Sequence, residues 1–205
     1  MKHMTGYKIV HLKLMVDELG EEKTKELLSK FSCPMNPDVE SFLRVKAIEF
    51  AKQGLAQTHM VYASYKGALT LAGYFSLSNK HITVKSSVLH GKLKQRIRRF
   101  STYDPVIKSY CMAAPLIAQL GKNYINKEIS DLISGDELLK LACDTVAAAQ
   151  FNVGGRFVYL ECEDKQKLIE FYSENGFCEF DRRTLDRDET GLSGDYLVQM
   201  LKYLH

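Results

Sequence analysis

The stretch "LISGDELLKLACD" (Leu132–Asp144) joins the pattern of a helix start to a glycine in the first turn. Ser134 followed three residues later by Glu137 matches a capping box, in which each side chain bonds a main-chain N–H group at the helix start. Asp136 and Glu137 also suit the positive end of the helix dipole. Neither argument accounts for Gly135, because glycine costs about 1 kcal/mol against alanine inside a helix.

Two interpretations of Gly135 stay open at this point. In the first, the glycine is structural, because such residues are common near helix ends and cost only a few tenths of a kcal/mol at the N-cap. In the second, the missing Cβ lets a ligand phosphate approach the N–H groups of the first turn. The second interpretation requires the side chains of Asp136 and Glu137 to point away from the phosphate.

The segments around this stretch predict alternating strands and helices. A nearly continuous apolar run at Tyr110–Gly121 predicts a buried central strand, and the helix that begins after Ser134 is expected to extend to about Gln150. Beyond it, "RFVYLECED" predicts a strand, "KQKLIEFYSENG" a helix, and "FCEFDRR" and "DYLVQMLKYL" two further strands.

The N-terminal part predicts one strand, two helices and a hairpin. Tyr7–Met15 alternates apolar and polar residues, which indicates a strand. "GEEKTKELLSKF" predicts a short helix and "NPDVESFLRVKAIEFAKQGL" an amphipathic helix that ends near Gly54. "THMVYASYKGALTLAGYFSLS" predicts an antiparallel hairpin with its turn at Lys66 and Gly67. The element order indicates an α/β or α+β protein, with a mixed sheet and helices on both faces.

These segments together resemble the GNAT N-acetyltransferase superfamily. Its members have a strand, a glycine-containing loop and a helix that hold the pyrophosphate of coenzyme A, followed by a strand and a helix that ends in Tyr-x-x-x-Gly-Phe. The matching residues are Gly135, Leu138 and Leu139 at the helix start, and Tyr172, Gly176 and Phe177 in the later signature. The resemblance is clear from about Leu116 to Phe180 and weaker over Phe31–Ser78.

The resemblance implies a single domain over residues 1–205, a twisted and mostly antiparallel sheet, and acetyl-CoA as co-substrate. It implies that main-chain groups of Leu120, Gly121 and Lys122 contact the pantetheine arm, with Gly121 leaving room for the acyl group. It also implies that the pyrophosphate meets the helix start, and that Tyr172 is the general acid. The implied pyrophosphate contacts are the N–H groups of Ile133, Ser134, Gly135, Asp136 and Glu137, together with the Lys165 side chain.

The sequence departs from the family pattern at three positions. The family loop reads Gln/Arg-x-x-Gly-x-Gly/Ala, and if Gly135 takes its last position, Ser130 and Ile133 stand at the earlier ones. Lys165 replaces the asparagine that commonly lies seven residues before the tyrosine. No general base is identified: Glu161 and Glu163 follow the solvated pattern of strand-end glutamates, and a water chain is the alternative.

Residues 86–106 form a basic insert that contains Lys92, Lys94, Arg96, Arg98 and Arg99. We expect a short basic helix or a loop outside the core. A solvated surface is the default interpretation of such a run, and a nucleic-acid footprint is the other. The chain also resembles toxin-type acetyltransferases that acetylate aminoacyl-tRNA, which carry a long basic insert before the central strand.

Composition limits the class of protein. The 205 residues carry a net charge of +3 and are 45% hydrophobic, which suits one globular domain and indicates nothing about partners. The cysteines form no Cys-x-x-Cys pair and the histidines are scattered, so we expect a reduced protein without a metal site. "MKHMTGYKIVHLKL" contains no long apolar run, so we expect no signal peptide or membrane span, and a cytoplasmic location.

Three functions are therefore compared. The first is transfer of an acetyl group from acetyl-CoA to a primary amine of a small molecule, protein or peptide, by direct attack. The second is the same chemistry on aminoacyl-tRNA, with toxin behaviour. The third is a non-catalytic GNAT-like protein that binds acyl-CoA or acts through interactions. A homodimer is compatible with all three.

Overall fold

The structure is a computed structural model that describes residues 6–186 and 194–204. These residues divide into two compact units, the first from 6–78 and 118–142 and the second from 79–117, 143–186 and 194–204. Strand β7 (Leu116–Lys122) and helix α7 (Gly135–Val153) contribute residues to both units. The single domain over residues 1–205 stays a prediction.

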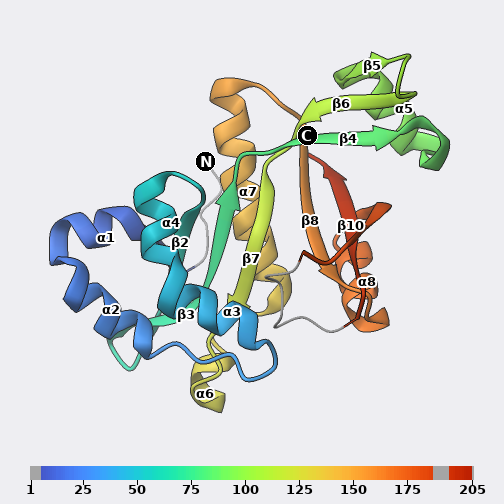
Figure 1. The fold of residues 1–205 in the computed structure, drawn as a ribbon. Helices are drawn as coiled ribbons and strands as arrows, with labels where there is room; N and C mark the ends of the chain where they lie inside the picture. Colours follow the sequence, from blue (N-terminus) through green and yellow to red (C-terminus); the bar gives the residue numbers. More distant parts are fainter. Residues whose placement is uncertain (1–5, 187–193, 205) are drawn as a thin grey trace. The chain divides into compact units, whose positions relative to one another are not determined.

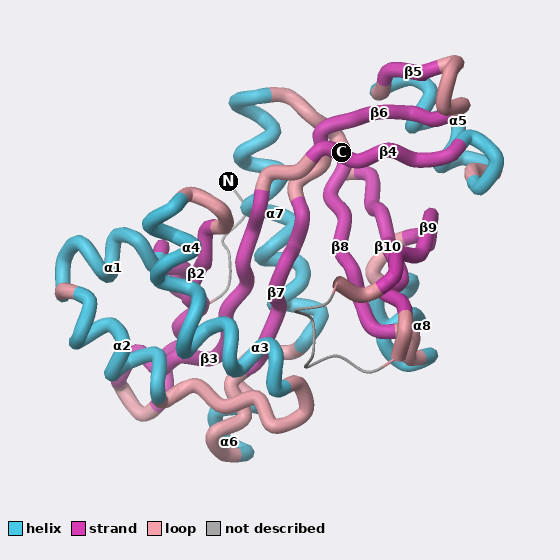
Figure 2. Tube along the Cα trace, viewed as in Figure 1, coloured by secondary structure: helices cyan, strands magenta, loops and turns pink. Residues whose placement is uncertain are grey.

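The first unit holds a four-stranded portion of sheet. Its strand order is β1-β2-β3-β7, and β2 pairs antiparallel with both β1 and β3. The elements are β1 Tyr7–His11, α1 Leu12–Leu19, α2 Glu21–Ser29, α3 Pro37–Ser41, the π-helical turn η1 Phe42–Lys46, α4 Ala47–Gln53, β2 Gln57–Tyr65, β3 Ala68–Ser78, the later residues of β7, α6 Lys127–Ser130 and the start of α7 (Figures 1 and 2).

Helices lie on both faces of this sheet. Successive side chains of a strand point to opposite faces. Tyr74 of β3 belongs to a buried cluster with Leu12, Phe31 and Leu43, so its side chain faces α1 to α4. Neighbouring Gly73 points to the opposite face of the sheet, where α7 lies: a Cβ built on Gly73 would lie 3.2 Å from the Cδ2 atom of Leu138 in α7. The prediction of helices on both faces is confirmed for this unit.

Local sequence signals account for most element boundaries in the first unit. Asn36 caps α3 by accepting a hydrogen bond from the Val39 N–H group, and Pro37 begins the helix. Gly54 ends α4 with φ of 71°, a left-handed conformation that favours glycine. Lys66 and Gly67 form the predicted hairpin turn with φ values of 49° and 79°. The predicted helix end near Gly54 and the predicted hairpin turn at Lys66 and Gly67 are confirmed.

The predicted strand Tyr7–Met15 is wrong in its second half. The strand ends at His11, and α1 begins at Leu12. The buried residues Leu12 and Met15 are three positions apart, a spacing that fits one face of a helix, whereas a strand would need even spacing. A stretch this short fits both periods, so packing decides the boundary.

The second unit contains two sheets. The smaller has the order β4-β6-β5, and the larger continues from the first residues of β7 through β8 and β10 to β9. All ladders here are antiparallel except β7–β8, a short parallel ladder that joins Leu116 and Ile117 to Tyr159 and Leu160. The elements are β4 His81–Lys85, the 3₁₀ turn η2 Ser86–Val88, α5 Gly91–Phe100, β5 Thr102–Asp104, β6 Ser109–Ala113, β8 Phe157–Glu163, α8 Gln166–Glu174, β9 Cys178–Thr184 and β10 Tyr196–Tyr203.

The single central strand predicted over Tyr110–Gly121 is wrong, because the structure divides it into β6 and β7. The break lies at Ala114 and Pro115. Proline has no N–H group to donate to a ladder, and the Ala114 N–H group donates instead to the Lys80 carbonyl at 3.0 Å. A continuous apolar run therefore serves two different sheets.

The expectation that the basic insert lies outside the core is also wrong. Ile97 of α5 is fully buried, and Leu93, one helical turn earlier, packs against the same cluster. That cluster also contains Val84, Leu89 and Phe157. The insert is an amphipathic helix, because its apolar residues recur four positions apart while the basic residues occupy the remaining surface.

Within the described residues, no helix combines the length and the apolar character needed to cross a bilayer.

Candidate functional site

The predicted capping box is present at the start of α7. The Ser134 N–H group donates to Glu137 Oε2 at 2.8 Å, and the Glu137 N–H group donates to Ser134 Oγ at 3.1 Å. The hydrogen bond from the Ser134 main chain is the main cause that lowers the pKa of Glu137. A carboxylate that is held ionised therefore lies at the positive end of α7.

Tyr7 connects β1 to this helix start, and the sequence analysis missed it. Its hydroxyl donates to the Leu132 carbonyl at 3.1 Å, across 125 residues of sequence. Burial and a hydrogen bond to the Glu137 carboxylate raise the pKa of Tyr7 to about 12. A tyrosine in a first strand gives no local signal for such a contact, because only the tertiary fold brings it to the loop.

The helix start retains donors that fit a diphosphate. The capping box uses the N–H groups of Ser134 and Glu137, two of the five predicted to contact the pyrophosphate. In the part of the chain that the structure describes, the main-chain N–H groups of Ile133 and Gly135 have no acceptor. These two groups are the remaining donors for an anion. The Glu137 carboxylate, however, accepts from the Ser134 N–H group between them, so the requirement that Glu137 point away from a phosphate is not met in this structure.

Gly121 of β7 is required by packing. A Cβ on Gly121 would overlap Cγ1 of Val39 and would lie 3.2 Å from Cζ of Phe31 and 3.4 Å from Cε1 of Tyr74. The position of the missing Cβ therefore faces a packed cluster of side chains, and the predicted room for the acyl group beside Gly121 stays a prediction. Contacts from the main chain of Leu120, Gly121 and Lys122 to pantetheine stay a prediction.

Asn123 fixes the end of β7 and is a second residue that the sequence analysis missed. Its main-chain N–H group donates to the Ala72 carbonyl at 2.8 Å and its side-chain Nδ2 to the Leu71 carbonyl at 3.0 Å. Its Oδ1 accepts from the Ser32 N–H group at 3.0 Å. One buried side chain thereby joins β7 to β3 and to the loop that follows α2.

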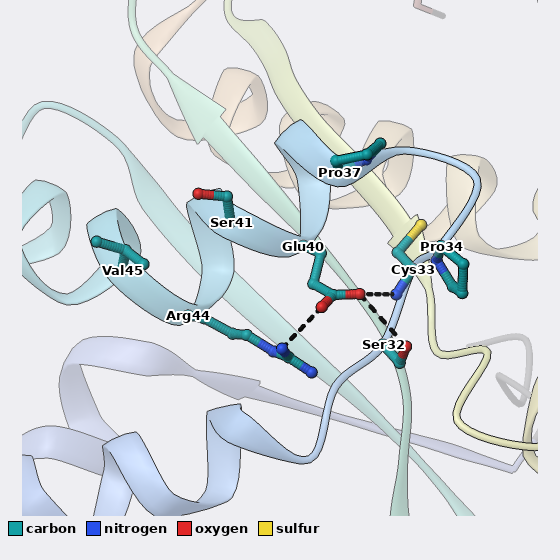
Figure 3. Close-up of a pocket in the computed structure, with 8 residues that line it drawn as sticks. All are labelled: Ser32, Cys33, Pro34, Pro37, Glu40, Ser41, Arg44 and Val45. Carbon is teal, nitrogen blue, oxygen red and sulfur yellow. Dashed lines mark hydrogen bonds and ion pairs between the residues drawn. The ribbon is translucent and has the colours of Figure 1, made fainter. Parts of the chain in front are cut away.

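A hollow of about 550 Å³ lies between that loop and α3. Figure 3 shows Glu40 pointing toward the loop, where its carboxylate accepts from the Cys33 N–H group at 2.6 Å and from the Ser32 hydroxyl at 3.3 Å. Arg44 donates to Glu40 at 2.7 Å and to the Phe31 carbonyl at 3.0 and 2.5 Å. The hollow is lined by Ser32, Cys33, Pro34, Pro37, Glu40, Ser41, Arg44 and Val45.

The polar wall of this hollow is rigid, because Glu40 and Arg44 are fully engaged with each other and with the main chain. Burial is the main cause that raises the pKa of the Cys33 thiol, so this cysteine remains protonated and is not a nucleophile. Ser41 and Val45 complete the lining of the hollow, and Val45 is 71% exposed.

Tyr172 lies on α8 in the second unit. Its ring contacts Phe171 and Phe177 edge to face, with centroid distances of 5.0 and 6.0 Å. Burial, followed by the nearby Cys162, raises the pKa of Tyr172 well above the ordinary value of a tyrosine, so the hydroxyl stays protonated. Gly176 has φ of 82° after the end of α8, and Phe177 is buried. Within the Tyr-x-x-x-Gly-Phe signature, Gly176 therefore forms the turn and Phe177 packs in the core. Tyr172 is the residue with a predicted chemical role.

Lys165 and the strand-end glutamates are engaged in ion pairs within the second unit. Lys165 Nζ donates to Glu163 Oε2 at 2.8 Å. Glu161 accepts from Arg183 at 2.8 Å and from Gln199 at 2.7 Å. Both carboxylates are therefore already engaged as hydrogen-bond acceptors, and the general base stays unidentified.

Of the predicted site residues, the structure brings together those at the end of β7 and those at the start of α7. Lys122 of β7 is close enough to Glu137 for its charge to lower the pKa of that carboxyl, so the strand end and the helix start are neighbours in the first unit. Lys165 and Tyr172 belong to the second unit, and their part in the same site stays a prediction. Within the described residues, no group of three His, Cys, Asp or Glu side chains could hold a metal ion.

No model of a protein family matches this sequence, and neither does any curated protein. Solved structures match it in three dimensions. A structure of AtaT complexed with acetyl-methionyl-tRNAfMet superposes with a TM-score of 0.60 at 15% identity, covering 94% of this chain and 93% of that chain. The chain has the GNAT fold.

Two further structures support the assignment of the GNAT fold. A Tyr-to-Phe mutant of KacT matches with a TM-score of 0.60 at 15% identity, over 95% of this chain and 94% of that chain. AtaTR bound with AcCoA matches with a TM-score of 0.56 at 13% identity, over 98% and 94%. The predicted mixed, mostly antiparallel sheet is confirmed. At this level of identity the match establishes the fold, and the activity is a separate proposal.

Proposed function

We propose that this chain is an acetyl-CoA-dependent N-acetyltransferase whose acceptor is the α-amino group of an aminoacyl-tRNA. The observation that carries the proposal is the match over nearly the whole of both chains to AtaT in complex with acetyl-methionyl-tRNAfMet. The related AtaTR was solved with AcCoA. An acetylated aminoacyl-tRNA is the product that acetyl transfer to a charged tRNA yields.

The chemistry requires positioning more than specialised side chains. The lone pair of the neutral amine attacks the thioester carbonyl carbon, the C–S bond breaks, and an amide forms. One proton leaves the nitrogen through water, and one proton must reach the departing sulfur. Because the described residues offer no free carboxylate for the first proton at Glu161 or Glu163, we assign that transfer to water.

Tyr172 is the proposed donor to the sulfur. Its pKa is raised by burial, whereas a thiol has a pKa of about 8.5. Because the tyrosine is the weaker acid, transfer of its proton to a thiolate is unfavourable. The proposed role of the hydroxyl is therefore to donate a hydrogen bond to the sulfur as negative charge develops, while the proton that the sulfur gains comes from water. Such donors contribute about 10²- to 10⁴-fold to rate, so Tyr172→Phe is expected to lower kcat by about 10²-fold or more.

The first unit supplies the proposed binding groups. The N–H groups of Ile133 and Gly135 would hold the diphosphate, and main-chain groups of Leu120, Gly121 and Lys122 would hold the pantetheine arm. Lys165 reaches a phosphate only if its ion pair with Glu163 opens. Because the Glu163 side chain is only 12% exposed, opening this pair removes a partner from a largely buried carboxylate and costs more than opening a fully exposed pair.

A second candidate function is a GNAT-like protein without catalysis. The observation that favours it is the capping box, which uses two of the five N–H groups predicted for the pyrophosphate. Calorimetry tests the form of this candidate that binds no acyl-CoA: no heat with acetyl-CoA at high micromolar concentration supports it. A non-catalytic protein that does bind acyl-CoA is separated from the enzyme only by the transfer assay below.

The decisive experiment is a transfer assay with radiolabelled acetyl-CoA. We expect label in acid-precipitable RNA with methionyl-tRNA, and none with uncharged tRNA. A peptide with a free N-terminal amine and methionine amide serve as alternative acceptors, because the broader proposal allows a small-molecule or peptide amine. Transfer to these acceptors but not to charged tRNA would contradict the tRNA assignment and retain the acetyltransferase.

A further inference from the structure

Helix α5 lies in a strongly basic part of the second unit. Between Asn79 and Tyr103 the sequence contains seven lysines and arginines and no aspartate or glutamate. Arg96, Arg98 and Arg99 are all exposed, and they occupy the surface that Leu93 and Ile97 leave free. The charge therefore belongs to one surface of a folded helix.

The arginines within the described residues fall into two groups. Arg44, Arg182 and Arg183 each form an ion pair with a carboxylate at 2.5–2.7 Å. Among the residues that the structure describes, Arg96, Arg98, Arg99 and Arg156 have no carboxylate partner. All four unpaired guanidinium groups belong to α5 or to the residue that precedes β8.

Three of these four lie over aromatic rings that contact one another. Arg96 Cζ is 4.6 Å from the ring centroid of Tyr203, and Arg99 and Arg156 are 5.3 and 5.9 Å from that of Phe100. The two rings are themselves 5.7 Å apart. Stacking orients a guanidinium but leaves its in-plane N–H donors unused.

Main-chain contacts fix the base of this cluster. Tyr203 pairs with Phe157 at the end of the β10–β8 ladder, and their rings pack at 5.6 Å. The Leu204 N–H group donates to the Arg156 carbonyl at 2.7 Å. The three guanidinium groups are therefore held on strand ends and a packed helix, so the surface is formed before any ligand binds.

We propose that Arg96, Arg99 and Arg156, stacked on Tyr203 and Phe100, form a preorganised site for the phosphate backbone of the acceptor RNA. We name this set the arginine–aromatic surface. The inference deepens the proposed function and rests on it for the choice of RNA. A guanidinium fork matches a phosphate in bidentate geometry, and arginine is among the residues that contact nucleic-acid backbones.

An RNA-binding role explains the arginine–aromatic surface better than a role as an ordinary solvated surface does. Solvated surface charges need no aromatic support, and elsewhere in the described chain the arginines neutralise carboxylates instead. Phe100 and Tyr103 are also 37% and 47% exposed, so a base that is not stacked in the RNA could stack beside the phosphates. Arg156, Phe100 and Tyr203 lie outside or at the edge of the basic run, so charge alone does not predict their part.

The test measures the Kd of uncharged tRNA by fluorescence anisotropy over a range of salt, without acetyl-CoA. We expect Arg96→Ala/Arg99→Ala/Arg156→Ala to weaken binding by about tenfold or more and to lower the slope of log Kd against log salt by about 2 to 3. The matched control is Lys25→Ala/Lys30→Ala/Lys52→Ala, which removes three exposed cations that are already paired with glutamates. The control is expected to bind tRNA within about twofold of wild type.

A lysine version keeps the test decisive if the alanine variant does not fold. Arg96→Lys/Arg99→Lys/Arg156→Lys retains the charges but loses the planar forks, so weaker binding than wild type supports the surface. Wild-type affinity and salt slope in a folded alanine or lysine variant overturn it, whichever other acidic partner the surface then binds.

The outcome is separable from that of the proposed function. Loss of tRNA binding in the variants, together with no acetyl transfer by the wild type, retains the RNA surface and removes the enzyme. Acetyl transfer to charged tRNA with unchanged binding by the variants retains the enzyme and removes the surface.

Discussion

Gly121 gives the sharpest test of how the first unit is built. A methyl group added there would overlap Cγ1 of Val39 and approach Phe31 and Tyr74 at 3.2 and 3.4 Å. The three neighbours are between 0% and 6% exposed, so none of them can move into solvent. Overpacking of this kind costs about 1–3 kcal/mol, and we expect Gly121→Ala to lower the free energy of unfolding by about 2 kcal/mol.

A double-mutant cycle with Val39 shows whether the cause is this contact. Val39→Ala alone leaves a cavity and is expected to cost about 1–3 kcal/mol. In the double variant the new methyl group occupies part of the space that Val39 vacates. The two changes together should therefore cost about 1–2 kcal/mol less than the sum of the single changes.

The assay is urea unfolding of the four proteins at neutral pH. Val45→Ala serves as the matched control, because Val45 follows on the same helix but is 71% exposed and should not couple to Gly121→Ala. If Gly121→Ala costs less than about 0.5 kcal/mol and shows no coupling to Val39→Ala, the packing argument is wrong. The glycine would then need the explanation that it leaves room for an acyl group, and the KM for acetyl-CoA should rise in Gly121→Ala.

Three other predictions concern the Ser134 cap of α7, the buried histidine His59 and helix α5. Ser134→Ala should lower the free energy of unfolding by about 1 kcal/mol in urea titrations, and an unchanged value would contradict the capping box. Burial, followed by the charge of His11, lowers the pKa of His59 to about 4; the native state therefore binds fewer protons than the unfolded state between about pH 6.5 and pH 4. The contribution of His59 to the free energy of unfolding is complete above about pH 6.5 and falls by at most about 3 kcal/mol as the pH drops through that window. His59→Phe should therefore flatten the dependence of the free energy of unfolding on pH. The control His81→Phe, at an exposed position, should leave that dependence unchanged. Ile97→Ala should cost about 2–5 kcal/mol, and a loss below about 0.5 kcal/mol would show that α5 is not part of the core.

The sequence determined the features that depend on neighbours along the chain. The capping box of Ser134 and Glu137, the Lys66–Gly67 turn and the Gly54 helix end are each complete within about four residues, so local chemistry is enough to predict them. The Tyr-x-x-x-Gly-Phe pattern at Tyr172 was readable for the same reason, and it led to the fold. The boundary between strand and helix at Leu12 could not be predicted, since a short apolar stretch fits both the helical and the strand period.

Tertiary structure alone decided which distant residues share a space. It placed Val39 in the gap at Gly121, joined Tyr7 to Leu132 across 125 residues, and buried Ile97 within a segment that its charge made appear entirely exposed. It also decided which arginines meet a carboxylate and which lie over Tyr203 and Phe100. The physical reason is that packing and ion pairing depend on distance in space, and a sequence without its fold specifies that distance only for residues a helical turn apart.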